Sequence, residues 1–215
     1  LLYQLLEGSW ENDAVKRDKA ARIFADPAKV HPVRHHGRYY DVEGYHLCEP
    51  SPQRTPVLFQ AGTSGRGQVF AARHAEAVFI GGNDKAAVRQ TVQELREQVV
   101  KAGRRADDLK IVLGVTVVPA ATQQEARDKH DEYLRHASPE AGLAHFSSSA
   151  GLDLSRYGLD EPIEFGQTNA IQSTVRVIQQ LGGTRRKLLE HFRLGGRYPA
   201  IVGDGNQVAD ELQSW

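Results

Sequence analysis

The sequence predicts an α/β fold with parallel strands, either about half of a (β/α)8 barrel or a small doubly wound sheet. Strand and helix patterns alternate four times between residues 57 and 212, and a long helical excursion over residues 120–197 precedes the last strand. Such alternation implies parallel strands joined by right-handed crossovers. Helical patterns also run up to Leu1 and Trp215. These ends favour the half barrel, and residues 1–215 are expected to form a single domain.

The amino-acid composition limits the kinds of binding partner and the cellular setting that we expect for this chain. The chain of 215 residues carries 27 basic and 27 acidic side chains, which argues against a nucleic acid or membrane recognised by bulk charge. No apolar run approaches the ~20 residues that span a bilayer. Cys48 is the single cysteine, which excludes an internal disulfide and indicates a reducing, cytoplasmic setting. The absence of methionine adds to the expectation of a fragment.

The first part of the chain shows helical and extended patterns. Residues 1–25 have a helical pattern interrupted near Gly8, and Pro27 ends it because proline disfavours helix at the preceding residue. Residues 37–44 are bounded by glycines and are expected to form a strand or one arm of a hairpin.

The first strand–helix unit follows. Val57, Leu58 and Phe59 form a continuous apolar run, which predicts a strand over residues 57–61 that is buried on both faces. A helix is expected over residues 65–74, with Ser64 as its N-cap.

The same alternation continues to the end of the chain. A short apolar strand over residues 77–80 precedes a long amphipathic helix capped by Asn83. Its apolar stripe repeats every three to four residues until Gly103. The β-branched run over residues 109–118 predicts one buried strand. A last strand and helix are expected over residues 198–202 and 206–212.

The excursion over residues 120–197 is too long for a plain crossover. Thr122 and Glu125 form a capping box, Ser138 and Pro139 open a second helix, and residues 184–192 form another helical pattern. Long excursions in compact domains are usually lids or binding loops, and one that follows a barrel strand lies at the face where active sites are built.

The turn between the first strand and its helix has the features of an anion site. Gly62 permits backbone conformations that other residues resist, and unpaired amides at the helix start attract phosphate. Thr63 and Ser64 add hydroxyls, and Arg66 adds a positive charge. The alternative is an ordinary capped turn without a ligand.

A second glycine-rich turn spans residues 203–208. It resembles the start of a dinucleotide fingerprint, but Val208 stands where a third small residue is needed. A second phosphate-facing loop or a plain turn fits better.

The histidines near the N-terminus do not predict a metal site. Their spacing, together with Cys48, matches no zinc pattern, and the chain contains neither CxxC nor HExxH. The residues concerned are His31, His35, His36 and His46.

His145 and Phe79 are the further candidates. His145 lies in the excursion and can act as acid or base near neutral pH. Phe79, near the carboxyl end of a strand, could line a pocket, with core packing as the alternative. Without a visible nucleophile–base pair or carboxylate pair, the chemistry is expected to belong to a bound cofactor.

Several segments resemble the flavin-dependent monooxygenases of the bacterial-luciferase superfamily. The most similar branch contains the nitrilotriacetate, dibenzothiophene-sulfone and long-chain-alkane monooxygenases. The resemblance covers nearly the whole chain and is carried by residues 3–10, 46–62, 70–79, 195–199, 202–203 and 207–212. Its most specific part is the string Cys48-Glu49-Pro50-Ser51-Pro52-Gln53-Arg54-Thr55-Pro56.

The resemblance implies a (β/α)8 barrel of which this chain is about the C-terminal half. It also implies a two-component enzyme that takes reduced FMN from a separate flavin reductase. With molecular oxygen, the flavin would form a C4a-hydroperoxide and oxygenate a small organic substrate. The family's phosphate-binding turn corresponds to Gln60, Ala61, Gly62, Thr63 and Ser64, its active-site histidine to His145, and a pocket phenylalanine to Phe79. Thr63 replaces a smaller residue such as serine and keeps its hydroxyl.

Other functions stay open. A deazaflavin-dependent oxidoreductase of the same superfamily, a non-catalytic luciferase-like subunit, and an unrelated phosphate-binding barrel are the alternatives. The substrate is not readable from the sequence. Because a half barrel has unpaired strand edges, we expect association into homo-oligomers and no turnover by the fragment alone.

Overall fold

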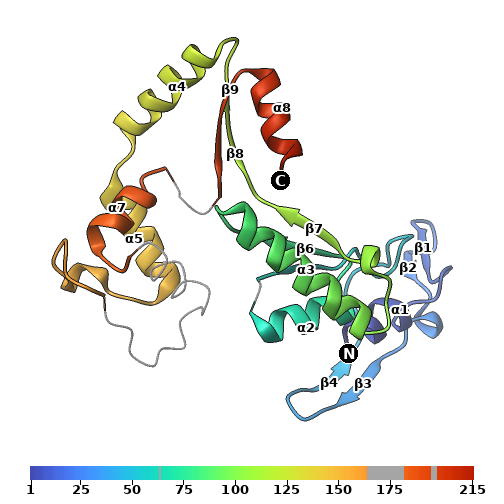
Figure 1. Cartoon of the computed structure of the whole chain (residues 1–215). Coiled ribbons are helices and arrows are strands. Elements are labelled where there is room, and N and C mark those ends of the chain that lie inside the picture. The colour runs from blue at the N-terminus through green and yellow to red at the C-terminus, as the bar shows by residue number, and fades with distance from the viewer. Residues whose placement is uncertain (63, 164–181, 195–197) are drawn as a thin grey trace. The chain divides into compact units, whose positions relative to one another are not determined.

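The computed structural model describes residues 1–62, 64–163, 182–194 and 198–215 (Figure 1). The chain divides into two compact units, residues 1–57 and 58–215. The assignment of a single domain to residues 1–215 stays a prediction. None of the helices in the described ranges has both the length and the apolar character needed to cross a bilayer.

The first unit contains one helix and two antiparallel hairpins. Helix α1 (Leu2–Gly8) is followed by the pair β1 and β2, a short 3-10 turn and the pair β3 and β4. The prediction of helix through residue 25 is wrong, because the chain leaves the helix at Ser9 and forms a hairpin instead. The hairpin arm predicted over residues 37–44 is confirmed for residues 41–44, whereas residues 37–40 form the turn between the two strands. The bounds are β1 (Val15–Asp18), β2 (Ile23–Ala25), η1 (Pro27–Lys29), β3 (Val33–His36) and β4 (Asp41–Gly44).

The string from Cys48 to Pro56 is tied to α1 by hydrogen bonds within the first unit. Arg54 donates to the carbonyl oxygen of Trp10 over 2.5 Å, and Thr55 donates its amide to the Glu7 carboxylate over 2.9 Å. The indole of Trp10 donates to the carbonyl of His46 over 2.7 Å. Because Arg54 and Thr55 make these hydrogen bonds, the string from Cys48 to Pro56 has a structural role in the first unit.

The second unit begins with a three-stranded parallel sheet. Strands β5 (Phe59–Ala61), β6 (Ala77–Ile80) and β7 (Lys110–Leu113) lie side by side in that order. Helix α2 (Gly65–His74) connects β5 to β6, and α3 (Lys85–Lys101) with η2 (Ala106–Asp108) connects β6 to β7. The predicted parallel α/β arrangement is confirmed.

One apolar core joins this sheet to its helices. Val78 and Ile80 of β6 pack with Leu95 and Val99 of α3 and with the buried alanines of α2. Figure 1 shows α2 and α3 beside β6 and β7, as this packing requires. The i, i+4 spacing of Leu95 and Val99 puts both on the face of α3 that meets the sheet.

Two details of this sheet differ from the prediction. The first strand is not buried on both faces, since Val57 is 49% and Phe59 57% exposed. The cap of α3 is Asp84 rather than Asn83, because the Asp84 carboxylate accepts the amide of Ala87 over 2.8 Å.

The long strand predicted over residues 109–118 is divided in two. After β7 the chain passes Gly114 and Val115 and continues as β8 (Thr116–Pro119), which pairs in parallel with β9 (Ala200–Gly203) (Figure 1). A Cβ on Gly114 would lie 2.5 Å from the ring of Tyr198, so only glycine fits at this break. Helices α4 (Gln123–His136) and α8 (Gly205–Gln213) contact this strand pair.

The described part of the excursion forms a second apolar cluster. It contains α5 (Pro139–Ala150), η3 (Leu154–Arg156) and α7 (Arg185–His191). Phe146 of α5 stacks on Phe192 with ring centroids 4.1 Å apart, and Leu188 of α7 is fully buried beside them. The predicted helix starts at Thr122 and Ser138 are confirmed by their capping hydrogen bonds.

Candidate functional site

The turn between β5 and α2 has the geometry of a helix-start anion site. Gly62 has a φ of +105°, a conformation that L side chains rarely adopt, and its amide donates to the carbonyl of Phe79 over 3.4 Å. The Ser64 hydroxyl accepts the amide of Gly67 over 3.2 Å as the N-cap of α2. Thr63, the remaining member of the predicted set, lies outside the described residues.

Gly67 and Gly65 are the glycines that the sequence predicts to leave room for a ligand beside the backbone. A Cβ on Gly67 would lie 3.1 Å from the Ser64 hydroxyl and 3.4 Å from the carbonyl oxygen of Gly62. The backbone of α2 therefore packs tightly behind the turn. Among the described residues, nothing lies within 4 Å of a Cβ on Gly62 or Gly65, so these residues leave the outer side of the turn open for a ligand.

The start of α2 differs electrostatically from the starts of α3 and α8. A carboxylate caps the other two helices, Asp84 for α3 and Asp204 for α8, and offsets the positive end of the helix dipole. The first turn of α2 has no acidic residue, its cap is the neutral Ser64, and Arg66 adds a positive charge. Of these three helix starts, α2 offers an anion the most favourable field.

The second glycine-rich turn is a capped turn. The Asp204 carboxylate accepts the amides of Asn206 and Gln207 over 2.9 and 3.0 Å. In return, the side-chain oxygen of Gln207 accepts the backbone amide of Asp204 over 3.1 Å. A carboxylate already satisfies these amides, so a phosphate would meet like charge. Of the two alternatives for residues 203–208, the plain turn is the one with structural support.

Gln60 and Phe79 lie next to the turn. The side-chain amide of Gln60 donates to the carbonyl oxygen of Ala61 over 3.1 Å. Phe79 of β6 pairs in register with Ala61, and its ring stacks on that of Phe59 with centroids 5.5 Å apart. Phe79 is 48% exposed, so within the described residues it is not a core side chain. The predicted residues Gln60, Ala61, Gly62, Ser64 and Phe79 are thus brought together by the β5–β6 ladder.

His145 belongs to another element. It is exposed on α5, beside Phe146, which is buried in the cluster of the excursion. Neighbouring positions on a helix point in different directions, so the packing of Phe146 leaves His145 at the surface of this cluster. Its predicted catalytic role stays a prediction.

The N-terminal histidines have ordinary partners. His31 contacts Glu11 over 2.9 Å, His36 contacts Asp41 over 3.2 Å, and His46 contacts the carbonyl of Cys48 over 3.0 Å. These contacts are spread over separate parts of the first unit. Among the described residues, no three His, Cys, Asp or Glu side chains gather as metal ligands would.

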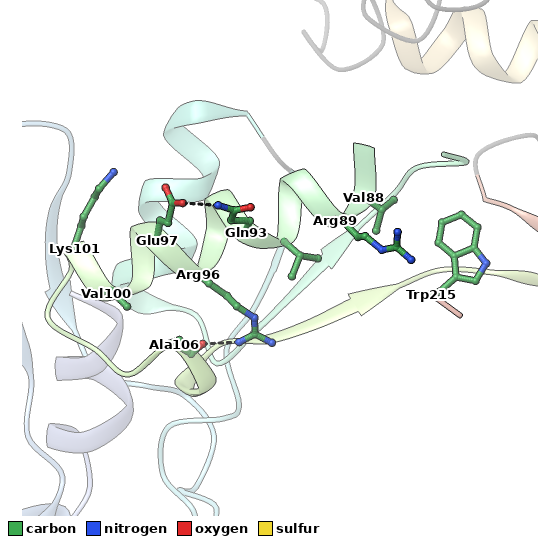
Figure 2. Close-up of a pocket in the computed structure, with 10 residues that line it drawn as sticks. Val88, Arg89, Gln93, Arg96, Glu97, Val100, Lys101, Ala106 and Trp215 are labelled. Carbon is green, nitrogen blue, oxygen red and sulfur yellow. Dashed lines mark hydrogen bonds between the residues drawn. The ribbon is translucent and has the colours of Figure 1, made fainter. Parts of the chain in front are cut away.

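An open groove of about 650 Å³ runs along α3 (Figure 2). Val88, Val92 and Val100 form its apolar side, and Arg89 lies near Trp215 at one end. None of the predicted site residues lines this groove. The chemistry suggested by the sequence therefore has to be sought at the β5–α2 turn and not in the groove.

Comparison with known proteins identifies the family. The family model described as luciferase-like monooxygenase matches residues 3–215. The chain belongs to this family. Dimethyl-sulfide monooxygenase of Hyphomicrobium sulfonivorans is 42% identical over the whole chain, which covers 46% of that protein. Long-chain alkane monooxygenase of Geobacillus thermodenitrificans is 41% identical over 98% of the chain, which covers 44% of it.

A solved structure of a relative has the same fold as this chain. The crystal structure of riboflavin lyase with modified FMN and riboflavin superimposes with a TM-score of 0.80 at 39% identity, over 98% of this chain and 47% of that one. The chain spans about half the length of the relatives it matches. Its α/β structure is that of part of a luciferase-like (β/α)8 barrel, and as a family member it is related to monooxygenases.

Proposed function

We propose that this chain is part of a two-component monooxygenase that uses reduced FMN and molecular oxygen to oxygenate a small organic molecule. The observation that carries the proposal is the β5–α2 turn, where a neutral cap, open space and a cationic side chain meet at a helix start. Membership of the luciferase-like monooxygenase family supports the phosphate of FMN as the ligand of this turn.

The residues present suit an FMN phosphate. The amides of Gly65 and Arg66 lie in the first turn of α2, where the helix offers no acceptor for them. The hydroxyl of Ser64 lies at the same place, and Gly62 keeps the approach free of a side chain. These groups would bind and orient the phosphate, and Arg66 would balance its charge. The bound reduced flavin supplies the electrons that activate oxygen.

The surroundings of the turn favour an uncharged substrate. Phe79 and Phe59 present stacked rings, and aromatic side chains bind apolar groups without fixed charge. The named substrates of the two monooxygenases at 41% and 42% identity, an alkane and dimethyl sulfide, are also uncharged and apolar. We therefore place Phe79 in the substrate pocket and expect an apolar substrate.

His145 is proposed as the acid–base group of the excursion, where it would hold or move a proton during oxygenation. A flavin reductase is proposed as the source of reduced FMN. Homo-oligomerisation and a cytoplasmic location stay predictions.

A second reaction is favoured by one observation. The riboflavin lyase structure is as similar to this chain as the monooxygenases are. Cleavage of riboflavin is therefore the alternative activity at the same flavin site.

One experiment separates these functions. The full-length protein and the 215-residue chain are titrated anaerobically with reduced FMN, and the full-length protein is then supplied with a flavin reductase, oxygen and each candidate substrate. Oxygenation of a sulfide or alkane supports the monooxygenase, whereas loss of riboflavin supports the lyase. No binding of FMN by the full-length protein would refute both and favour a deazaflavin enzyme or a non-catalytic subunit. Binding but no turnover by the isolated chain is expected.

A further inference from the structure

Glu76 joins all three strands of the parallel sheet. It lies between α2 and β6, and its carboxylate accepts the amide of Leu58 over 3.0 Å. Its own amide donates to the carbonyl of Leu58 over 2.9 Å, and its carbonyl accepts the amide of Lys110 over 2.8 Å. Leu58 immediately precedes β5 and Lys110 begins β7. This one residue therefore bonds to the starts of both outer strands, to Lys110 through its backbone and to Leu58 through its backbone and its carboxylate.

The contact with Leu58 closes a loop that contains the phosphate turn. The chain runs from Leu58 through β5, the turn and α2, and it returns to Leu58 at Glu76. The far end of α2 is fixed as well, because Arg104 donates to the carbonyls of Ala72 and Ala75 over 2.9 Å each. The turn and the Glu76 contact thus lie at opposite ends of the same strand and the same helix.

Besides the contact with the Glu76 carboxylate, β5 is held by its pairing with β6 and by the amides of Glu76 and Ala77, which both donate to the carbonyl of Leu58. The strand is only three residues long, and the bond at its carboxyl end, from Gly62 to Phe79, measures 3.4 Å. A side-chain carboxylate takes the place of a backbone acceptor at its amino end, where it satisfies the Leu58 amide. Loss of this carboxylate would leave the Leu58 amide without its partner and loosen the amino end of β5, so that the turn at the carboxyl end of the strand would be held less firmly.

We propose that Glu76 is a positioning residue for the flavin phosphate, acting through Leu58 and β5. The inference rests on the proposed function of the β5–α2 turn. In this proposal Glu76 does not contact the ligand. It acts by fixing the position of β5, and with it the position of the backbone amides that bind the phosphate.

The test compares two flavins that differ only in the phosphate. Binding of reduced FMN and of reduced riboflavin to the full-length protein is measured for the wild type and for Glu76→Ala, Glu76→Gln and Glu97→Ala. Glu97 is a matched control, since it is an exposed glutamate that accepts one hydrogen bond, from Gln93, on α3. We expect Glu76→Ala to weaken FMN binding about three- to tenfold, the scale of one lost hydrogen bond, and to leave riboflavin binding unchanged. Glu76→Gln, which keeps an oxygen acceptor, restores most of the preference for FMN.

The outcomes separate the two levels of the proposal. A wild-type protein that binds FMN no better than riboflavin would refute the phosphate site itself. A wild-type preference for FMN that survives in Glu76→Ala would refute only the role of Glu76. An equal loss for both flavins, or the same loss in Glu97→Ala, would mean a general loss of stability and also refute positioning. If Glu76→Ala does not fold, Glu76→Asp, with a carboxylate one methylene shorter, is expected to show the same selective loss of FMN binding, and an unchanged preference for FMN would refute the proposal.

Discussion

Two regions of the second unit are held together by different interactions. In the sheet region, residues 58–113, the site residues are placed by ladder hydrogen bonds between short parallel strands, and α2 and α3 cover one face. In the part of the excursion that follows α4, the described residues of α5, η3 and α7 pack with their neighbours through six buried apolar side chains. The β5–α2 turn is therefore positioned by strand pairing, whereas the surroundings of His145 are held by side-chain packing.

The largest effects are expected from core truncations in each region. Leu95 and Leu188 are both fully buried, so Leu95→Ala and Leu188→Ala should each lower the free energy of unfolding by about 2–5 kcal/mol. Urea denaturation followed by circular dichroism measures the loss. Hydrogen exchange should then increase in β6 and α2 for Leu95→Ala, and in α5 for Leu188→Ala. Increased exchange in both regions for both variants would show that the sheet region and the excursion unfold as one unit, and it would contradict the difference between the two regions.

A smaller effect is expected from a glycine that lets two helices of the excursion approach. A Cβ on Gly142 of α5 would lie 2.3 Å from the carbonyl oxygen of Phe192. Gly142→Ala should therefore destabilise the protein by about 1–3 kcal/mol, the scale of overpacking. Gly8→Ala is the control, because nothing lies within 4 Å of a Cβ there, and it should leave the thermal midpoint unchanged or slightly higher. Equal midpoints for the two variants would contradict the close approach of α5.

The two serine caps offer a direct comparison of the regions. Ser64 accepts the amide of Gly67 over 3.2 Å, and Ser138 accepts the amide of Ala141 over 3.1 Å. Each alanine variant should lose about 1 kcal/mol of stability through its helix cap. Ser64→Ala should in addition weaken FMN binding by about 1–3 kcal/mol, the scale for a hydrogen bond to a charged group. Unchanged FMN affinity in Ser64→Ala would remove this hydroxyl from the phosphate site.

The smallest effect concerns an ion pair of the excursion. The Arg186 guanidinium donates to both oxygens of Asp160 over 2.7 and 2.8 Å and holds the pKa of that carboxyl below its usual value. A carboxyl whose pKa is lower in the folded state contributes stability above its unfolded pKa, and this contribution disappears as the pH falls through the folded pKa. Asp160→Asn should thus lower the urea midpoint slightly at about pH 7 and not at about pH 2, well below the ordinary pKa of aspartate. A difference that persists in acid would contradict this ionic contribution.

Much of the fold follows from local patterns. The helix over residues 65–74, its serine cap and the capping box at Thr122 were predictable because each depends on residues close together in the chain. The motif resemblance likewise identified the family from the sequence alone, because motif residues are read directly. The candidate phosphate turn was found by the same means, from Gly62, Ser64 and Arg66.

Contacts between distant residues decided what these local patterns could not. Helix was expected through residue 25, yet the bonds of Trp10 and Arg54 to distant backbone and side chains accompany a hairpin there. A continuous apolar run suggested burial of Phe59 on both faces, but burial depends on which elements cover the strand, and here Phe59 stacks on Phe79 instead. The links of Glu76 to Leu58 and Lys110 were invisible for the same reason. Most elements, their caps and the family could be read from the chain, because these depend on neighbouring residues, whereas register and burial required the folded molecule, because these depend on segments that meet only in space.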